Sequence, residues 1–206
     1  MCNREETIEK AISSYFNDSK SAINGLNNHL DVIGRMALGI YNSQLAGHKL
    51  LIGGNGGSCS DAEHFAGEMV CTYSDPDRRA FSAISLTNNA SAVTAWANDF
   101  GFDSYFLRQV QALGQSGDIL FLISTGGGDR EKGYSMNLVD AADKALEMGL
   151  TLYSIVGKAG GELAKISHEH VHVASFKTSH IQEAHIAIIH AVCESLDALA
   201  RSDRDN

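Results

Sequence analysis

Short apolar runs alternate with longer helical patterns along this chain, and that alternation constrains the fold more than any other feature. The runs lie at residues 49–52, 81–86, 119–123 and 150–156, with a weaker one at 170–174. The stretches between them repeat apolar residues at helical spacing: 60–73, 89–97, 104–113, 135–148 and 180–200. Strands that helices cover on both faces read as continuous apolar runs. The sequence therefore predicts an α/β fold around a parallel sheet.

Two helical patterns precede the first run, at residues 7–26 and 33–41. The chain has 206 residues, enough for one well-buried core, and its composition does not change along its length. We expect one domain over residues 1–206, with an N-terminal helical part at 1–47 and an α/β core at 48–206.

Charge and cysteine usage narrow the function classes. The formal net charge is −9, and the resulting field opposes binding to nucleic acids and to anionic membranes. Residues 1–10 are polar, and no apolar run approaches the roughly 18 residues of a membrane span. The four cysteines include no CxxC pair, which favours reduced thiols in the cytoplasm. A packing role is expected for Cys59 rather than a reactive one.

A glycine-rich loop, Gly-Gly-Asn-Gly-Gly-Ser at 53–58, follows the first run and precedes a helix. Glycines let a backbone approach a ligand closely, and the free N–H groups at a helix start attract anions. Parallel sheets bind ligands beyond the carboxyl ends of their strands, where this loop should lie. A phosphate site is one interpretation, and a tight turn without a ligand is the other.

A second loop, Ser-Thr-Gly-Gly-Gly-Asp at 124–129, repeats the design after the third run. Loops on neighbouring strands could together grip one phosphate through hydroxyls and backbone amides. Asp129 would repel that phosphate, and Arg130 and Lys132 could offset its charge.

A set of metal-ligand residue types stands on two predicted helices. His64 and Glu68 are four residues apart and share a helix face, and Gln182 and His190 lie on roughly one side of the last helix. Imidazole, carboxylate and amide donors suit Zn²⁺. On spacing alone an ordinary surface pair remains the commoner explanation. Histidines 168, 170 and 172 alternate as on one strand face, where packing or an exposed edge is the simpler interpretation.

Five segments together resemble a known family: GGNGGSCSDAEHFAGEM (53–69), WANDFGF (96–102), LIST (122–125), VGKAGGELA (156–164) and HIQEAHIAIIH (180–190). They are similar to bacterial phosphoheptose isomerases, SIS-domain proteins that interconvert sedoheptulose 7-phosphate and D-glycero-D-manno-heptose 7-phosphate. The resemblance implies a flavodoxin-like sheet of five parallel strands with helices on both faces. It also implies a homotetramer with active sites at subunit interfaces, N-terminal helices for oligomerisation, and a role in heptose biosynthesis.

The resemblance also implies site residues. One Zn²⁺ per subunit would be held by His64, Glu68, Gln182 and His190, with Glu68 and His190 as the catalytic acid–base pair. The expected substrate contacts are Asn55, Gly56, Gly57, Ser58, Glu68, Asn98, Asp99, Ser124, Thr125, Ser135 and Gln182.

This chain departs from the family pattern around the phosphate and the sugar. The loop at 126–134 reads as an insertion that moves the last serine to Ser135, and Thr72 and Ser179 replace an arginine and an aspartate. One alternative is therefore an isomerase or binder for another sugar phosphate. Another is a non-catalytic SIS scaffold resembling the regulator that binds the replication initiator protein, which the presence of Glu68 and His190 disfavours.

Overall fold

A sheet of five parallel strands forms the centre of the computed structural model, which describes residues 4–205. The strands lie in the order β2-β1-β3-β4-β5. Their bounds are β1 (Leu50–Gly54), β2 (Ala83–Ser85), β3 (Ile119–Ser124), β4 (Thr151–Val156) and β5 (Glu169–His172). The predicted parallel sheet and the implied strand number are confirmed. Every residue of β1 and β3 is buried, which explains why these strands read as unbroken apolar runs.

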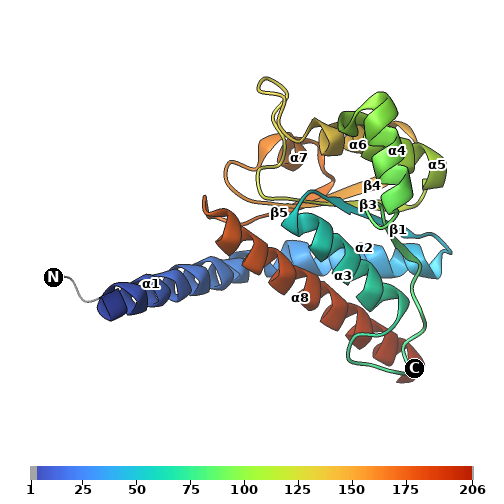
Figure 1. Ribbon diagram of the computed structural model, residues 1–206. Helices are drawn as coiled ribbons and strands as arrows, with labels where there is room; N and C mark the ends of the chain where they lie inside the picture. Colours follow the sequence, from blue (N-terminus) through green and yellow to red (C-terminus); the bar gives the residue numbers. More distant parts are fainter. Residues whose placement is uncertain (1–3, 206) are drawn as a thin grey trace.

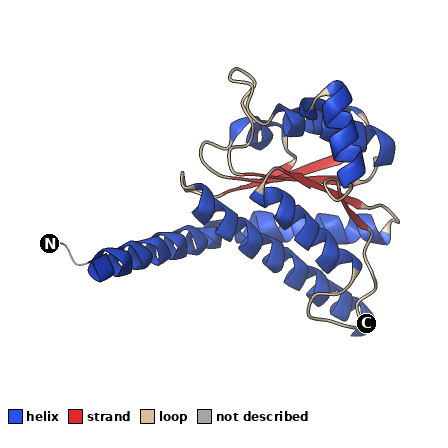
Figure 2. Cartoon of the chain, in the orientation of Figure 1, coloured by secondary structure: helices blue, strands red, loops and turns tan. Residues whose placement is uncertain are grey.

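Helices cover both faces of the sheet (Figures 1 and 2). On one face α2 (Leu30–Leu45), α3 (Gly57–Val70) and α8 (Thr178–Asp205) close the larger apolar core. On the other face α5 (Tyr105–Leu113), α6 (Met136–Glu147) and α7 (Gly161–Ile166) close the second core. The short helix α4 (Ala90–Phe100) lies outside that layer and has no fully buried residue. A 3-10 turn (Phe102–Ser104) joins it to α5.

The first helix, α1 (Arg4–Asn24), extends well beyond the body of the molecule (Figure 1). A 3-10 turn (Gly25–His29) links it to α2. Its side chains Ile8, Ile12 and Phe16 follow one another at helical spacing and are 58%, 51% and 65% exposed. More than half of each side chain in this apolar stripe is therefore exposed to solvent in a single chain.

Three differences from the sequence prediction affect elements around the sheet. The helix α3 begins at Gly57 rather than residue 60, so the glycine loop itself supplies the first turn. The edge strand β2 keeps only three residues. The helix α7 was not predicted, because it has only six residues, too short a stretch to show a helical period, and its first residue and N-cap are both glycines with positive φ.

No helix within residues 4–205 is long and apolar enough to cross a membrane.

Candidate active site

The two glycine-rich loops meet at the carboxyl ends of neighbouring strands. Strands β1 and β3 pair in register, with Gly54 opposite Ile123, so Asn55 and Ser124 leave the sheet side by side. A cleft of about 820 Å³ opens between the loops. Its lining includes most of the residues expected to contact substrate: Asn55, Gly56, Gly57, Ser58, Ser124, Thr125, Ser135 and Gln182. The structure therefore brings together loops that lie far apart in the sequence.

A pair of asparagines ties the two walls of this cleft together. Asn55 donates to Asn137 Oδ1 at 3.0 Å, and Asn137 donates back to Asn55 Oδ1 at 2.9 Å. Asn137 lies in the first turn of α6 and is buried. The sequence analysis did not identify Asn137, because the local pattern of α6 does not indicate a hydrogen-bond partner 82 residues away.

The first loop lies close to α8 at Gly57, where a larger residue would displace the Gln182 side chain. A Cβ on Gly57 would stand 2.2 Å from Gln182 Nε2, far inside van der Waals contact. The absence of that Cβ lets the Gln182 amide lie against the start of α3, at the edge of the cleft. Ser58 follows directly and is almost completely buried.

The second loop is held from behind by α7. The backbone N–H groups of Glu162 and Leu163 donate to the carbonyls of Gly128 and Gly127 at 3.1 and 2.8 Å. The Ser124 hydroxyl accepts from Gly127 N at 3.0 Å, which curls the loop back over the end of β3. A Cβ on Gly161 would stand 2.4 Å from the Gly128 carbonyl oxygen. The glycines thus permit a close backbone approach that shapes the cleft wall.

The inserted segment forms a small hairpin at the cleft mouth. Asp129 and Tyr134 pair backbone to backbone, and both line the cleft. The Asp129 carboxylate accepts from the backbone N–H groups of Glu131 and Lys132, each at 3.0 Å. Those contacts with Lys132 hold the pKa of the Asp129 carboxyl below its ordinary value. Lys132 also forms an ion pair with Asp129 at 3.4 Å.

Arg130 does not act as sequence reasoning suggested. Its guanidinium donates to both carboxylate oxygens of Asp143, at 2.9 and 2.8 Å, and approaches Glu162 at 3.6 Å. The Asp129 charge is therefore offset by Lys132 and the backbone, while Arg130 braces the hairpin against α6 and α7.

Ser135 lies at the start of α6, as expected. It has left-handed backbone geometry (φ 52°), and its side chain caps no backbone group of the helix. Its hydroxyl is thus available to the cleft that the residue lines. The starts of α3, α6 and α8 all contribute to this lining, through Gly57, Ser135 and Thr178. Three helix N-termini at one cleft favour an anionic ligand.

A lysine that sequence reasoning overlooked, Lys158, also lines the cleft. It follows β4 and belongs to a segment in which no residue had been singled out. The signal that could have found it is its position, since a cation just after the carboxyl end of a parallel strand faces the ligand edge of the sheet.

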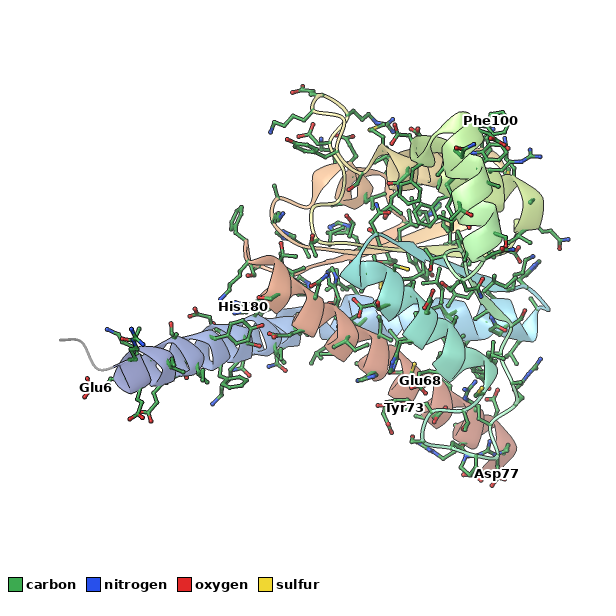
Figure 3. All side chains as sticks on the ribbon, viewed as in Figure 1. Glu6, Glu68, Tyr73, Asp77, Phe100 and His180 are labelled. Atoms are coloured by element: carbon green, nitrogen blue, oxygen red, sulfur yellow. The ribbon has the colours of Figure 1, made fainter. Side chains whose placement is uncertain are left out.

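The predicted acid–base residues lie further along α3 and α8, beyond the cleft lining. His64 Nε2 is 3.1 Å from Glu68 Oε1 and 3.2 Å from His190 Nε2. The ring of Tyr73 lies over His190, with centroids 5.7 Å apart. Figure 3 shows Glu68 close to Tyr73, with His180 far away at the start of α8. The structure therefore brings His64 into contact with Glu68 and with His190.

One more carboxyl stands on α3 beside this group. Asp61 has a buried Oδ2 atom with no hydrogen-bond partner among the described residues. Burial raises the pKa of the Asp61 carboxyl to about 6, and nearby His64 acts in the opposite direction. The Asp61 carboxyl is therefore partly shielded from solvent, whereas the neighbouring His64 side chain is 44% exposed.

The donor chemistry around His64 fits zinc in part. Two imidazole nitrogens 3.2 Å apart match ligands at about 2.0–2.1 Å from a tetrahedral ion, whose mutual separation is roughly 3.3 Å. Within residues 4–205, however, no group of three or more His, Cys, Asp or Glu side chains is arranged to hold a metal ion. Gln182 lies about two helical turns from His190, against Gly57. The fourth predicted ligand thus belongs to the cleft in this arrangement.

A buried ion pair anchors the end of α3 that carries Glu68. Arg78 Nε lies 2.7 Å from Asp197 Oδ1 of α8, and both side chains are almost fully buried. The same guanidinium donates to the Glu68 carbonyl at 2.6 Å. A cation at the last carbonyls of a helix complements the helix dipole. Arg78 therefore fixes the backbone at Glu68, a contribution that the sequence did not reveal.

The remaining predicted positions are not part of this cleft. Asn98 and Asp99 lie on α4, with Asn98 donating to Asp99 Oδ1 at 2.8 Å, and neither lines the cleft of its own chain. The Thr72 hydroxyl donates to the Asp75 carbonyl at 2.7 Å within its own loop. Cys59 is half-buried beside a smaller pocket of about 250 Å³. Cys2 lies outside the described residues.

Comparison with known proteins defines the class first. The SIS domain family model matches residues 14–157, well over half of the chain. This is therefore a SIS-domain protein. Two solved phosphoheptose isomerase structures share the fold. The protein from Neisseria gonorrhoeae has a TM-score of 0.83 at 33% identity, covering 93% of this chain and 99% of its own. The protein from Francisella tularensis has a TM-score of 0.85 at 32% identity, covering 93% and 98%.

Sequence relatives narrow the assignment. A probable phosphoheptose isomerase from Thermoplasma volcanium is 40% identical over 171 residues, which cover 83% of this chain and 82% of the relative. The phosphoheptose isomerase from Alteromonas mediterranea is 42% identical over 168 residues, covering 80% and 81%. Within the SIS-domain proteins, the chain belongs to the phosphoheptose isomerase family.

Proposed function

We propose that this protein is an aldose–ketose isomerase that interconverts sedoheptulose 7-phosphate and D-glycero-D-manno-heptose 7-phosphate. The observation that carries the proposal is the joint placement of an anion-binding cleft and an acid–base group along one helix. Gly57 opens α3 in the cleft, and His64 stands seven residues further on, about 10 Å at the helical rise. An extended seven-carbon sugar phosphate has a comparable length, so its phosphate and its carbonyl end could occupy the two places together.

The residues divide the work according to their position. The Ser124, Thr125 and Ser135 hydroxyls and the helix N-termini would bind the phosphate group, because they line the cleft and donate hydrogen bonds. Asn55 and Gln182 would orient the hydroxyl groups of the chain. Holding both ends of a flexible substrate keeps the reacting carbons in place, which lowers the entropic part of the barrier.

Proton transfer between C1 and C2 falls to the acid–base pair. Glu68 would remove the carbon-bound proton and return it to the neighbouring carbon of a cis-enediol. His190 would donate to and accept from the oxygens. The contact of His64 with both partners, at 3.1 and 3.2 Å, supports a common site for them. A Zn²⁺ ion on His64, Glu68 and His190, with Gln182 as fourth ligand once its amide leaves Gly57, would supply a Lewis acid for the carbonyl and hydroxyl oxygens.

A homotetramer with active sites at subunit interfaces belongs to the same proposal. The apolar stripe of α1 is a face that a second copy could cover. Asn98 and Asp99, which lie outside the cleft of their own chain, would be supplied to a site by movement of α4 or by a neighbouring subunit. We place the enzyme in the cytoplasm, where its sugar-phosphate substrates are made, without nucleic-acid or membrane partners.

A second candidate, a related sugar phosphate as substrate, is favoured by the hairpin at the cleft mouth. Asp129 and Tyr134 line the cleft where the family pattern has a shorter loop. Either residue would touch the part of a substrate next to the phosphate. A non-catalytic scaffold role is disfavoured by the contact between His64 and both Glu68 and His190.

An assay of heptose, hexose and pentose phosphates, with and without a chelator, separates these candidates. We expect the highest kcat/KM with sedoheptulose 7-phosphate and loss of activity after chelation, restored by added Zn²⁺. Higher kcat/KM for a pentose or hexose phosphate would establish the second candidate. If no substrate is turned over even when zinc is supplied, the non-catalytic scaffold is the remaining candidate.

A further inference from the structure

We propose that Lys158 provides the positive charge that binds the substrate phosphate, and that His172 positions it. The inference rests on the proposed function in one respect, namely that the ligand of the cleft carries a phosphate group. It adds a residue that neither the family resemblance nor the loop motifs assigned.

Lys158 is the one cation that lines the cleft within the described chain. Its ammonium group has no carboxylate within ion-pair distance among residues 4–205, and its side chain is exposed. Three neighbouring basic side chains are already in ion pairs: Arg130 with Asp143, Lys132 with Asp129, and Lys165 with Glu162. An uncompensated cation beside three helix N-termini is available to an anion, whereas its neighbours are not.

The backbone of Lys158 is held in an unfavourable conformation. Its φ is 49°, in the left-handed region that non-glycine residues seldom adopt. Two contacts hold it there. Lys158 N donates to the Ser175 carbonyl at 2.9 Å, and His172 Nε2 donates to the Lys158 carbonyl at 2.8 Å. Strained residues persist where their surroundings over-determine them, and they gather at ligand sites.

The rest of the cleft leaves a place for such a charge. The glycine run 126–128 contributes no side-chain donor, and the Asp129 carboxylate is already neutralised by Lys132 and backbone amides. Hydroxyls and amides can bind phosphate oxygens, but they bring no full charge to balance a dianion. Lys158 would supply that charge from the loop that follows β4, the strand next to β3.

Binding of inorganic phosphate, measured calorimetrically on the full chain, tests Lys158 directly. The variant Lys158→Asn removes the charge and keeps a residue type that tolerates left-handed geometry. Lys165→Asn makes the same charge change at an exposed, ion-paired lysine outside the cleft. We expect about tenfold weaker phosphate binding in Lys158→Asn, the size of one charged hydrogen bond, and less than a twofold change in Lys165→Asn.

Turnover gives a second readout that keeps the two proposals apart. In Lys158→Asn we expect KM for the sugar phosphate to rise about tenfold while kcat changes less than threefold. Unchanged phosphate affinity in Lys158→Asn, or an equal loss in Lys165→Asn, would overturn the inference whatever the activity. If the native chain isomerises no sugar phosphate but Lys158→Asn still loses phosphate, the isomerase proposal fails and the phosphate site stands.

The positioning role of His172 predicts non-additivity. His172→Ala should weaken phosphate binding several-fold in the native background and have no further effect in Lys158→Asn. Thermal melting of each variant checks that the fold is retained. Equal effects of His172→Ala in both backgrounds would show that His172 does not act through Lys158.

Discussion

Histidines in this chain occupy very different surroundings, as His185 and His190, five positions apart on α8, show. His190 faces His64 across the groove between α3 and α8. His185 is completely buried on the core side of the same helix. Residues five positions apart on a helix project from different faces, which accounts for the contrast. Burial lowers the pKa of the His185 imidazole to about 4, with the Val156 backbone acting weakly the other way.

This shift predicts how stability depends on pH. The ordinary pKa of the imidazole is 6.5 and the folded value is about 4, so the folded state resists the proton that the unfolded state accepts. The contribution of His185 to stability is therefore complete above pH 6.5 and is lost as the pH falls toward 4, by roughly 3 kcal/mol at most. The variant His185→Leu has no imidazole to titrate at this position. Urea unfolding should show that the native chain loses roughly 3 kcal/mol more stability than this variant between pH 6.5 and pH 4.

A difference between the two proteins that stays constant from pH 7 to pH 4 would contradict the buried, neutral state of His185. Measuring both proteins at each pH cancels the contribution of groups that they share.

At the scale of elements, the end of α3 depends on α8 through a buried ion pair. Arg78 contacts Asp197 and the Glu68 carbonyl, and Asp197 also accepts from the Ser74 and Asp75 backbone amides. Removing one partner leaves the other charge buried without compensation. Arg78→Met should therefore lower the free energy of unfolding by about 3–5 kcal/mol. It should also reduce activity, because the backbone at Glu68 loses its anchor.

The neighbouring Arg79 gives a matched control, since its side chain is exposed. Arg79→Met should change the free energy of unfolding by no more than about 0.5 kcal/mol. Equal stabilities of the two variants in urea titrations would show that the ion pair does not hold α3 to α8.

The same elements show how far the sequence could reach. The strands β1, β3 and β4 were predictable because each is a continuous apolar run, and α8 because its apolar period persists over many turns. The helix α7 was not, because backbone contacts to the glycine loop, rather than an apolar stripe, determine its position. The local sequence pattern indicates which residues of a helix or strand are buried, but it does not indicate backbone contacts between a helix and a distant loop.

The two glycine loops of the site were predictable, because each directly follows an apolar run that indicates a strand. The long-range partners Asn137 and Arg78 were not, because each acts through residues remote in sequence. The metal ligands, Asn98 and Asp99 remain predictions.

For the whole molecule, α1 raises the question of assembly. Its outer half projects from the body (Figure 1). A helical segment as short as this half is only marginally stable in water when nothing packs on it. Ile8, Ile12 and Phe16 form an exposed apolar stripe along it. A second copy packing on that stripe would stabilise the helix, in keeping with the proposed tetramer.

Charged substitutions on the stripe test this arrangement. Ile12→Glu with Phe16→Glu should reduce the mass measured by light scattering to that of a smaller species, because two charges would have to be buried. Lys10→Glu with Ser14→Glu changes the opposite face of the helix and should leave the mass unchanged. An unaltered mass for the first pair would show that α1 does not form the contact.

The central claim is that Glu68 moves a carbon-bound proton of a sugar phosphate, and isomerisation of sedoheptulose 7-phosphate in D₂O tests it most directly. The native chain should form aldose that carries solvent deuterium at C2. Glu63→Gln, a control on the same helix, should do the same. Glu68→Gln should fold normally yet lose on the order of 10² or more in kcat, with exchange falling in parallel. Near-native turnover and deuterium incorporation in Glu68→Gln would contradict the account.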